Sequence, residues 1–230
     1  NITQDEHVEY GSKFGELEGH PNLKNKRVTH PKIFELAAST GGIADEWHTD
    51  ITFQDSPAIM SVLHMVKCPE LGGDTMWSNL NAAYEALSDT MKEMLDGLDA
   101  VHSASEAYTV EGTQAKYDKK TAITYSWDDS IMDEVVHPVI RTHPETGRKA
   151  LYVNDMFTLR IQGMSKSESR ALLDYLFIHA TRPEFCCRFR WSENAVAIWD
   201  NRCMQHYAVD DYQAYERLMY RVTIEGCRPV

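Results

Sequence analysis

The spacing of apolar and polar residues along the chain predicts three helices. Two of them begin at capping boxes, in which a hydroxyl side chain and a glutamate three residues later each bind the other's backbone N–H. The third follows from a stretch rich in Ala, Leu, Met and Glu whose apolar residues recur at helical spacing. The predicted helices are one opened by Thr3 and Glu6 that ends near Gly15, one within residues 80–98, and one opened by Ser165 and Glu168 that stops at Arg182-Pro183.

Short apolar runs between turn-forming residues predict strands. Residues 22–46 are expected to form long loops around one of these strands, and residues 103–134 a polar loop or insertion. Many short strands with two or three capped helices predict a β-rich α+β fold, a jelly roll with helices packed outside it. The predicted strands are residues 33–38, 59–66, a hairpin-like pair of 135–141 with 150–153, 186–191, 195–199 and 218–224.

Composition and charge limit the partners of this domain. The 230 residues suffice for one domain with a substantial core, and 43% apolar with 25% charged residues is ordinary for a globular protein. A formal charge of -12 argues against nucleic acid or an anionic membrane as partner, because both require a basic surface. No apolar run approaches the ~20 residues of a membrane span, which favours a cytoplasmic protein. The five cysteines are odd in number and form no Cys-x-x-Cys pair, which favours reduced thiols.

The first candidate for chemistry is the segment Trp47–Phe53, which contains His48 and Asp50. In an extended strand these two side chains would project to the same face and could bind one cation. They would supply two ligands of the 2-His-1-carboxylate facial triad, which suits Fe(II) and leaves positions open for a co-substrate and O2. Taken alone the pair is weak, and a polar strand edge is the commoner explanation.

A second candidate lies in the last predicted strand, where Arg217 and Arg221 fall on one face, four residues apart. Two arginines on a strand face are ordinarily a solvated edge with salt bridges. Here they follow an apolar strand that leads into a polar turn, residues 198–206, which ends at His206. This context makes a plain solvated edge less favoured than it would be for the two arginines alone.

Taken together, these motifs resemble the Fe(II)- and 2-oxoglutarate-dependent dioxygenases of the taurine dioxygenase (TauD/TfdA) family. The resemblance covers almost the whole chain, residues 1–230, as a single domain, although members of the family usually carry additional strands before the point where this sequence begins. The N-terminus lacks an initiator Met and an apolar signal segment, which suggests a portion of a longer chain. The motifs are Trp47-His48-Thr49-Asp50, Gly72-Gly73-Asp74-Thr75, His137-Pro138-Val139 with Arg141-Thr142-His143-Pro144, and Trp199-Asp200-Asn201-Arg202 leading to His206. The resemblance also includes the spacing of eleven residues from His206 to Arg217 and of four residues from Arg217 to Arg221.

The resemblance implies a double-stranded β-helix with iron in its mouth, and it implies a role for each motif. Arginine suits the two anion-binding roles, since its planar fork binds a carboxylate bidentately and stays charged when buried. The implied roles are His48, Asp50 and His206 as iron ligands, Thr75 and Arg217 for the 2-oxoglutarate carboxylate, Arg221 for the anion of the substrate, and His20, Ile51, Tyr108 and Phe157 as further substrate contacts.

The resemblance further implies that O2 and 2-oxoglutarate are consumed, that succinate and CO2 are released, and that a small organosulfonate is hydroxylated and collapses to sulfite and an aldehyde. Taurine is the best single substrate, but Ala44 and Leu23 stand where the taurine enzyme has polar side chains. The alternatives are a sulfate ester, an aryloxyacetate-type carboxylate, or a jelly-roll binding protein without turnover. Family members commonly self-associate, so a homo-oligomer is also expected.

Overall fold

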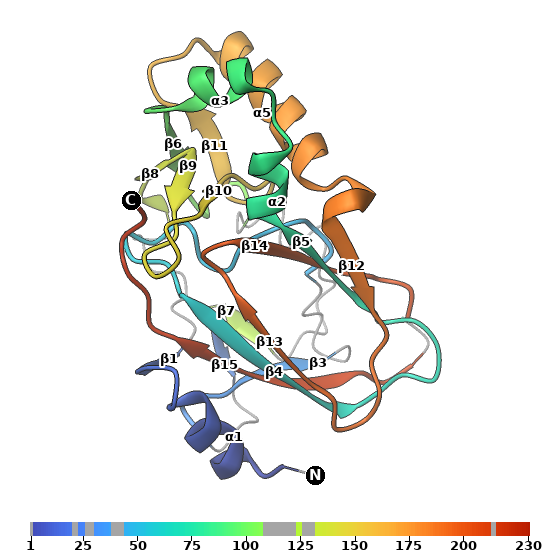
Figure 1. Cartoon of the computed structure of the whole chain (residues 1–230). Helices are drawn as coiled ribbons and strands as arrows, with labels where there is room; N and C mark the ends of the chain where they lie inside the picture. The colour runs from blue at the N-terminus through green and yellow to red at the C-terminus, as the bar shows by residue number, and fades with distance from the viewer. Residues whose placement is uncertain are drawn as a thin grey trace.

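The computed structural model describes residues 2–19, 23–25, 30–37, 44–107, 123–125, 132–212 and 215–230 (Figure 1). Most of the predicted insertion at residues 103–134 lies outside these ranges. Two residues predicted to contact substrate, His20 and Tyr108, also lie outside them.

The largest sheet is built around the last strand of the chain. β15 pairs antiparallel with β4 on one edge, and β4 pairs in turn with β13. β1 and β3 pair with opposite ends of the other edge of β15. Alternation along β4 and β15 turns Leu63, Met65 and Met219 toward the core. The strands of this sheet are β1 (Leu17–Glu18), β3 (Phe34–Ala37), β4 (Met60–Lys67), β13 (Val196–Asp200) and β15 (Leu218–Ile224).

A three-stranded sheet lies across the core from the large one, in the order β12-β5-β14. Trp77 of this sheet and Trp191 just beyond it pack in one buried cluster with Trp199 of the large sheet. Figure 1 shows the two sheets facing each other. The side chains of this cluster pack between them. The strands are β5 (Thr75–Asn79), β12 (Cys186–Phe189) and β14 (Met204–Ala208).

Three helices and two small sheets form the upper part of the molecule in Figure 1. The sheets have the orders β11-β6-β8 and β10-β9, and a second cluster of buried aliphatic residues joins them to the helices. The elements are α2 (Leu80–Glu85), α3 (Asp89–Leu95), α5 (Lys166–Ala180), the 3-10 turn η3 (Pro183–Phe185), β6 (Asp99–His102), β8 (Val135–Pro138), β9 (Ile140–Thr142), β10 (Lys149–Leu151) and β11 (Thr158–Ile161); elsewhere β2 (Leu23–Asn25) pairs with β7 (Ile123–Tyr125).

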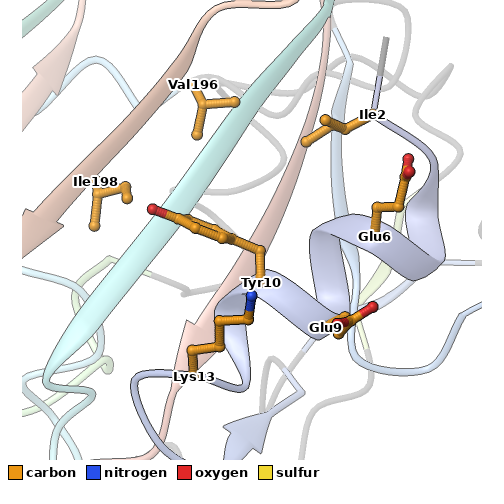
Figure 2. A pocket seen from close by; sticks show the side chains of 7 residues that line it. All are labelled: Ile2, Glu6, Glu9, Tyr10, Lys13, Val196 and Ile198. Carbon is orange, nitrogen blue, oxygen red and sulfur yellow. The ribbon is translucent and has the colours of Figure 1, made fainter.

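The first helix, α1 (Gln4–Gly11), packs on the outer face of the large sheet. The close approach requires a glycine, because a Cβ on Gly11 would lie 2.6 Å from Cγ2 of Val222. Beside this contact α1 and β13 leave an open apolar hollow, drawn in Figure 2. It is lined by Ile2, Glu6, Glu9, Tyr10, Lys13, Val196 and Ile198.

Both predicted capping boxes are present, at Thr3 with Glu6 and at Ser165 with Glu168. The first helix ends at Gly11, earlier than the predicted Gly15. The helix predicted within residues 80–98 is two short helices, because the Ser88 side chain accepts a hydrogen bond from the Met91 backbone and opens a new one.

Two strand predictions need correction. In the predicted hairpin, β9 pairs with β10, whereas β8 pairs with β6. The segment Trp47–Phe53 is not a strand: His48 forms an isolated bridge, and the chain turns at Ile51, whose φ is +48°. Strand β14 was not predicted, because its segment contains the polar residues Gln205 and His206. Both are nevertheless buried.

The β-rich architecture expected from the sequence is confirmed, with antiparallel sheets and few helices. Among the described residues, none of the helices combines the length and the apolar character that crossing a membrane requires. Cys68, Cys186, Cys187, Cys203 and Cys227 are all free.

Candidate active site

The segment that carries His48 and Asp50 is held against β14 by its backbone. The N–H of His48 donates to the carbonyl of His206 at 3.0 Å, and the N–H of His206 donates to the carbonyl of His48 at 2.8 Å. The Thr49 hydroxyl, which points away from the site, donates to the Met204 carbonyl at 3.0 Å. This bridge, rather than an extended strand, places two distant parts of the chain side by side.

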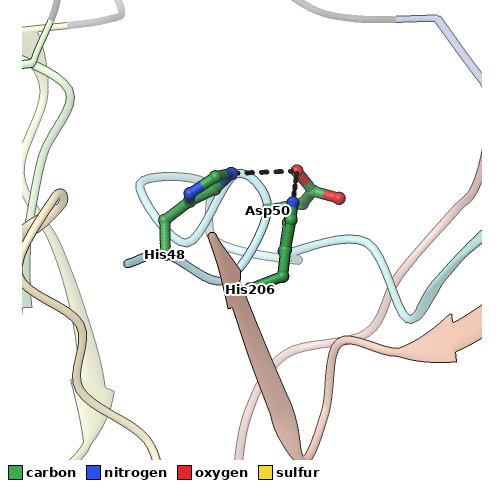
Figure 3. A group of neighbouring side chains, drawn as sticks. All are labelled: His48, Asp50 and His206. Carbon is green, nitrogen blue, oxygen red and sulfur yellow. Dashed lines mark ion pairs between the residues drawn. The ribbon is translucent and has the colours of Figure 1, made fainter. Parts of the chain in front are cut away.

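The side chains of His48, Asp50 and His206 converge, as Figure 3 shows. Oδ1 of Asp50 lies 3.8 Å from Nε2 of His48 and 4.0 Å from Nε2 of His206. The three ligand atoms lie within 4.8 Å of one another, and all three residues are buried. A divalent cation bonded at ~2.0–2.2 Å to each ligand fits between atoms at this separation.

The protonation of these groups also suits a divalent cation. Burial lowers the pKa of both imidazoles, that of His206 to about 3, so each is neutral and keeps a lone pair. Nδ1 of His48 donates to the Glu46 carbonyl at 2.7 Å, which leaves Nε2 as the free nitrogen. Burial alone would raise the pKa of the Asp50 carboxyl, but the Arg221 guanidinium and the two imidazoles hold it below its ordinary value. The donor set is therefore two neutral imidazoles and one carboxylate, which fits Fe(II).

Thr75 and Arg217 lie next to this group. In the pairing of β5 with β14, Thr75 is opposite Ala208 and Trp77 is opposite His206, so Thr75 shares the inner face with the His206 ligand. The Thr75 hydroxyl accepts a hydrogen bond from Nε1 of Trp191 at 2.9 Å, which leaves its own proton available to an acceptor.

The Arg217 guanidinium is held by two contacts, to Gly73 and to Tyr212. Its Nε donates to the carbonyl of Gly73 at 3.2 Å, two residues before Thr75, and the group lies 5.1 Å over the Tyr212 ring. Arg217 is buried, and burial lowers the pKa of its guanidinium. Among the described residues, no carboxylate forms an ion pair with it. A buried cation that no carboxylate of the described residues neutralises is suited to bind an anion that enters from outside.

Arg221 lies on β15 and contacts both Asp50 and Phe34 of the neighbouring strand β3. Its Nη1 donates to Oδ1 of Asp50 at 2.7 Å, and its guanidinium lies 5.4 Å from the Phe34 ring centroid. Nε of Arg221 is buried and has no hydrogen-bond partner within the described structure. Arg221 therefore contacts a candidate metal ligand while retaining donor capacity.

Two predicted apolar substrate contacts, Ile51 and Phe157, are buried next to the same group. The Phe157 ring is 6.3 Å from the His48 ring and 5.0 Å from the Phe53 ring. Ala44 lies at the margin, where its carbonyl accepts a hydrogen bond from the Ala208 N–H at 2.9 Å. The structure thus brings together eight of the ten predicted site residues, and the other two, His20 and Tyr108, lie outside the described ranges.

A second group, His143, Asp200 and Cys203, also brings potential ligand atoms close together. The Asp200 carboxylate is already bound by Arg202 through two nitrogens, at 2.9 and 2.7 Å, and by Nε2 of His143 at 3.0 Å. Burial raises the pKa of the Cys203 thiol to about 11, so sulfur stays protonated. We interpret this group as structural.

The family model described as "Taurine catabolism dioxygenase TauD, TfdA family" matches residues 1–223. The chain belongs to the TauD/TfdA family. This TauD/TfdA chain is 40% identical over 228 residues to an "Alkylsulfatase" of Acinetobacter baylyi, an alignment that covers 93% of the chain and 68% of the relative. It is 39% identical over 225 residues to an "Alpha-ketoglutarate-dependent sulfate ester dioxygenase" of Pseudomonas putida, covering 93% of the chain and 73% of the relative. A crystal structure of a taurine dioxygenase from Burkholderia xenovorans superimposes with a TM-score of 0.81 at 37% identity, covering 99% of the chain and 74% of that structure.

The resemblance to the TauD/TfdA family stated from the sequence is therefore confirmed, as is the enzyme class, a 2-oxoglutarate-dependent dioxygenase. The sequence did not predict two residues whose side chains donate hydrogen bonds to the predicted site residues. Trp191 donates to Thr75, 116 residues away in the sequence, and Ser61 donates to Asp50, 11 residues away. No local pattern marks them, because the contacts depend on how distant strands pair.

Proposed function

We propose that this chain is an Fe(II)- and 2-oxoglutarate-dependent dioxygenase of small organosulfur anions. The observation that carries the proposal is the convergence of His48, Asp50 and His206 within 4.8 Å, in a neutral, neutral and anionic donor set. These residues would hold the iron. Thr75 would bind the far carboxylate of 2-oxoglutarate through its free hydroxyl proton, and Arg217 would bind it through its buried guanidinium.

Bound iron would supply the oxidation in which O2 and 2-oxoglutarate become succinate and CO2 while one oxygen atom enters the substrate. The residues of the chain would position the reactants and exclude water. Nε of Arg221 would hold the substrate anion beside Asp50, and Ile51 and Phe157 would enclose its carbon atoms. Hydroxylation of the carbon that bears the anion would then give an unstable product, which releases sulfite from a sulfonate or sulfate from a sulfate ester and leaves an aldehyde.

Between the two organosulfur classes, we favour an alkyl sulfate ester and retain taurine as the second candidate. Two relatives at 39% and 40% identity are named for sulfate esters or alkyl sulfates. The methyl group of Ala44 at the margin of the site offers no hydrogen bond to the ammonium group of taurine. A structural neighbour named as a taurine dioxygenase supports taurine.

Succinate formation with Fe(II), 2-oxoglutarate and O2 tests the proposal. The substrates are an alkyl sulfate, the alkylsulfonate of the same chain length, taurine and an aryloxyacetate, with sulfate, sulfite and phenol as separate products. We expect sulfate release from the alkyl sulfate and no turnover by Asp50→Asn. Release of phenol alone would reassign the substrate to the carboxylates. Absence of O2 consumption and succinate with every substrate, despite bound metal, would favour a jelly-roll binding protein without turnover.

We propose that the two facing sheets form the double-stranded β-helix, that residues 1–230 are one domain, and that the protein acts in the cytoplasm as a homo-oligomer. Sedimentation of the purified protein tests the last of these.

A further inference from the structure

The two oxygens of the Asp50 carboxylate have different surroundings. Oδ1 faces Nε2 of His48 and of His206 at 3.8 and 4.0 Å, and it accepts from Arg221 at 2.7 Å. Oδ2 accepts a hydrogen bond from the Ser61 hydroxyl at 2.9 Å. Ser61 lies on β4 and is fully buried. Only one carboxylate oxygen is therefore directed at the position between the imidazoles.

The Ser61 hydroxyl is itself fixed by two further side chains. Nδ2 of Asn201 donates to Oγ of Ser61 at 3.4 Å, so the hydroxyl proton is directed to the carboxylate. Nε1 of Trp199 donates to Oδ1 of Asn201 at 2.8 Å. Because an indole N–H can only donate, this bond fixes the Asn201 amide with its oxygen toward Trp199 and its nitrogen toward Ser61. All three residues are buried, so water does not compete for these bonds.

We infer that Trp199, Asn201 and Ser61 form a positioning relay, which makes Asp50 present a single oxygen to the metal. This inference rests on the proposed function. A carboxylate free to rotate could offer both oxygens and occupy one of the positions that 2-oxoglutarate and O2 require. Hydrogen bonds to a ligating carboxylate also fix its orientation before the metal arrives, which strengthens binding.

The relay is tested by Mn(II) binding to the metal-free protein, followed by the electron paramagnetic resonance signal of unbound Mn(II). We expect Ser61→Ala to weaken Mn(II) binding about tenfold or more, as is usual for loss of a partner of a metal ligand. Ser169→Ala is the control, because Ser169 is also buried and its hydroxyl accepts a hydrogen bond, from the Ile161 N–H at 2.8 Å, but it does not contact a predicted metal ligand. The control should bind Mn(II) as the wild type does.

A second variant, Asn201→Ala, tests the relay at another of its three residues. It also keeps the relay testable if Ser61→Ala does not fold. If the residues act as one unit, Asn201→Ala weakens Mn(II) binding, and the double variant is no weaker than Ser61→Ala alone. The melting temperature of each metal-free variant separates loss of fold from loss of binding.

The outcomes are distinguishable. Mn(II) binding by the wild type that is unchanged in folded Ser61→Ala and Asn201→Ala would overturn the relay and leave the proposed function intact. Failure of the wild type to bind Mn(II) would overturn both. Equal weakening by Ser61→Ala and Ser169→Ala would mean that any buried hydroxyl has this effect, and it would also overturn the relay.

Discussion

The indole N–H of Trp191, just beyond β12, donates to the hydroxyl of Thr75 on β5 at 2.9 Å, and both side chains are buried. With this acceptor position filled, the Thr75 proton is free for 2-oxoglutarate. We expect Trp191→Phe to raise the KM for 2-oxoglutarate about fivefold, since one net hydrogen bond is worth ~1 kcal/mol. Steady-state kinetics with 2-oxoglutarate varied measures the effect.

Trp77→Phe is the control for this substitution. Trp77 lies in the same buried cluster, but its indole nitrogen has no hydrogen-bond partner within the described structure. Both changes remove similar volume, so equal increases in KM would show that packing alone, and not the bond to Thr75, is responsible.

Gly73 and Arg217 meet where the chain leaves the turn before β5. Gly73 has a φ of +72°, and a Cβ there would lie 3.1 Å from Cδ of Arg217 and 2.9 Å from Cγ of Pro69. Gly73→Ala should therefore displace the guanidinium and raise the KM for 2-oxoglutarate severalfold. It should also lower the melting temperature, since a left-handed conformation costs an alanine ~1–2 kcal/mol.

Gly97→Ala separates the two effects of that change. Gly97 has a similar φ of +75°, but a Cβ there would meet nothing within 4 Å. We expect a comparable loss of stability and an unchanged KM. An increase of KM in both variants would trace it to general destabilisation.

Arg217 and Arg221 are expected to bind different anions. Arg217→Ala should raise the KM for 2-oxoglutarate, and Arg221→Ala the KM for the prime substrate, each about 30-fold or more, because truncating a buried charge partner costs ~2 kcal/mol at least. Because Arg221 also donates to Asp50, both variants are assayed at saturating metal. Equal effects of both changes on both ligands would contradict the assignment.

Local rules predicted the parts of the fold that depend on neighbouring residues. Both capping boxes open helices, because their hydrogen bonds span only three residues. Alternation along the last predicted strand placed Arg217 and Arg221 on one face, and both are buried, Arg221 on β15 and Arg217 directly before it. The family resemblance then supplied the roles that alternation alone could not.

Long-range pairing explains what the sequence did not reveal. His48 and Asp50 were expected on a strand, but they converge with His206 because the backbone bridges β14 and turns at Ile51. Ser61 lies in a strand that was predicted from its apolar residues, and no local pattern predicted a role for its hydroxyl. Its contact with Asp50, 11 residues earlier, depends on the bridge between His48 and His206 that positions the segment carrying Asp50.

Glu18 is expected to make stability depend on pH. Burial, with repulsion from Glu225, raises the pKa of its carboxyl from 4.5 to about 7, and its Oε1 has no hydrogen-bond partner within the described structure. The unfolded chain ionises first, so the stabilisation is complete below pH 4.5 and is lost as pH rises through 7. The melting temperature of metal-free Glu18→Gln should therefore exceed that of the wild type increasingly from pH 5 to pH 8. Glu93→Gln, at an exposed position, should show no such trend, and a parallel trend in both would contradict the prediction.

Arg141 is a buried guanidinium that lies 4.9 Å over the Tyr152 ring and makes a long hydrogen bond to Cys227. It is 1% exposed, its Nη2 donates to Sγ of Cys227 at 3.7 Å, and its Nε and Nη1 have no partner within the described structure. A carboxylate in place of the thiol would give this cation a counter-charge. We expect Cys227→Asp to raise the melting temperature by roughly 3 °C or more, since a hydrogen bond to a charged group is worth ~1.5 kcal/mol or more. Cys227→Asn has the same shape without the charge and should gain much less, so equal melting temperatures for the two variants would show that Arg141 does not require an anion.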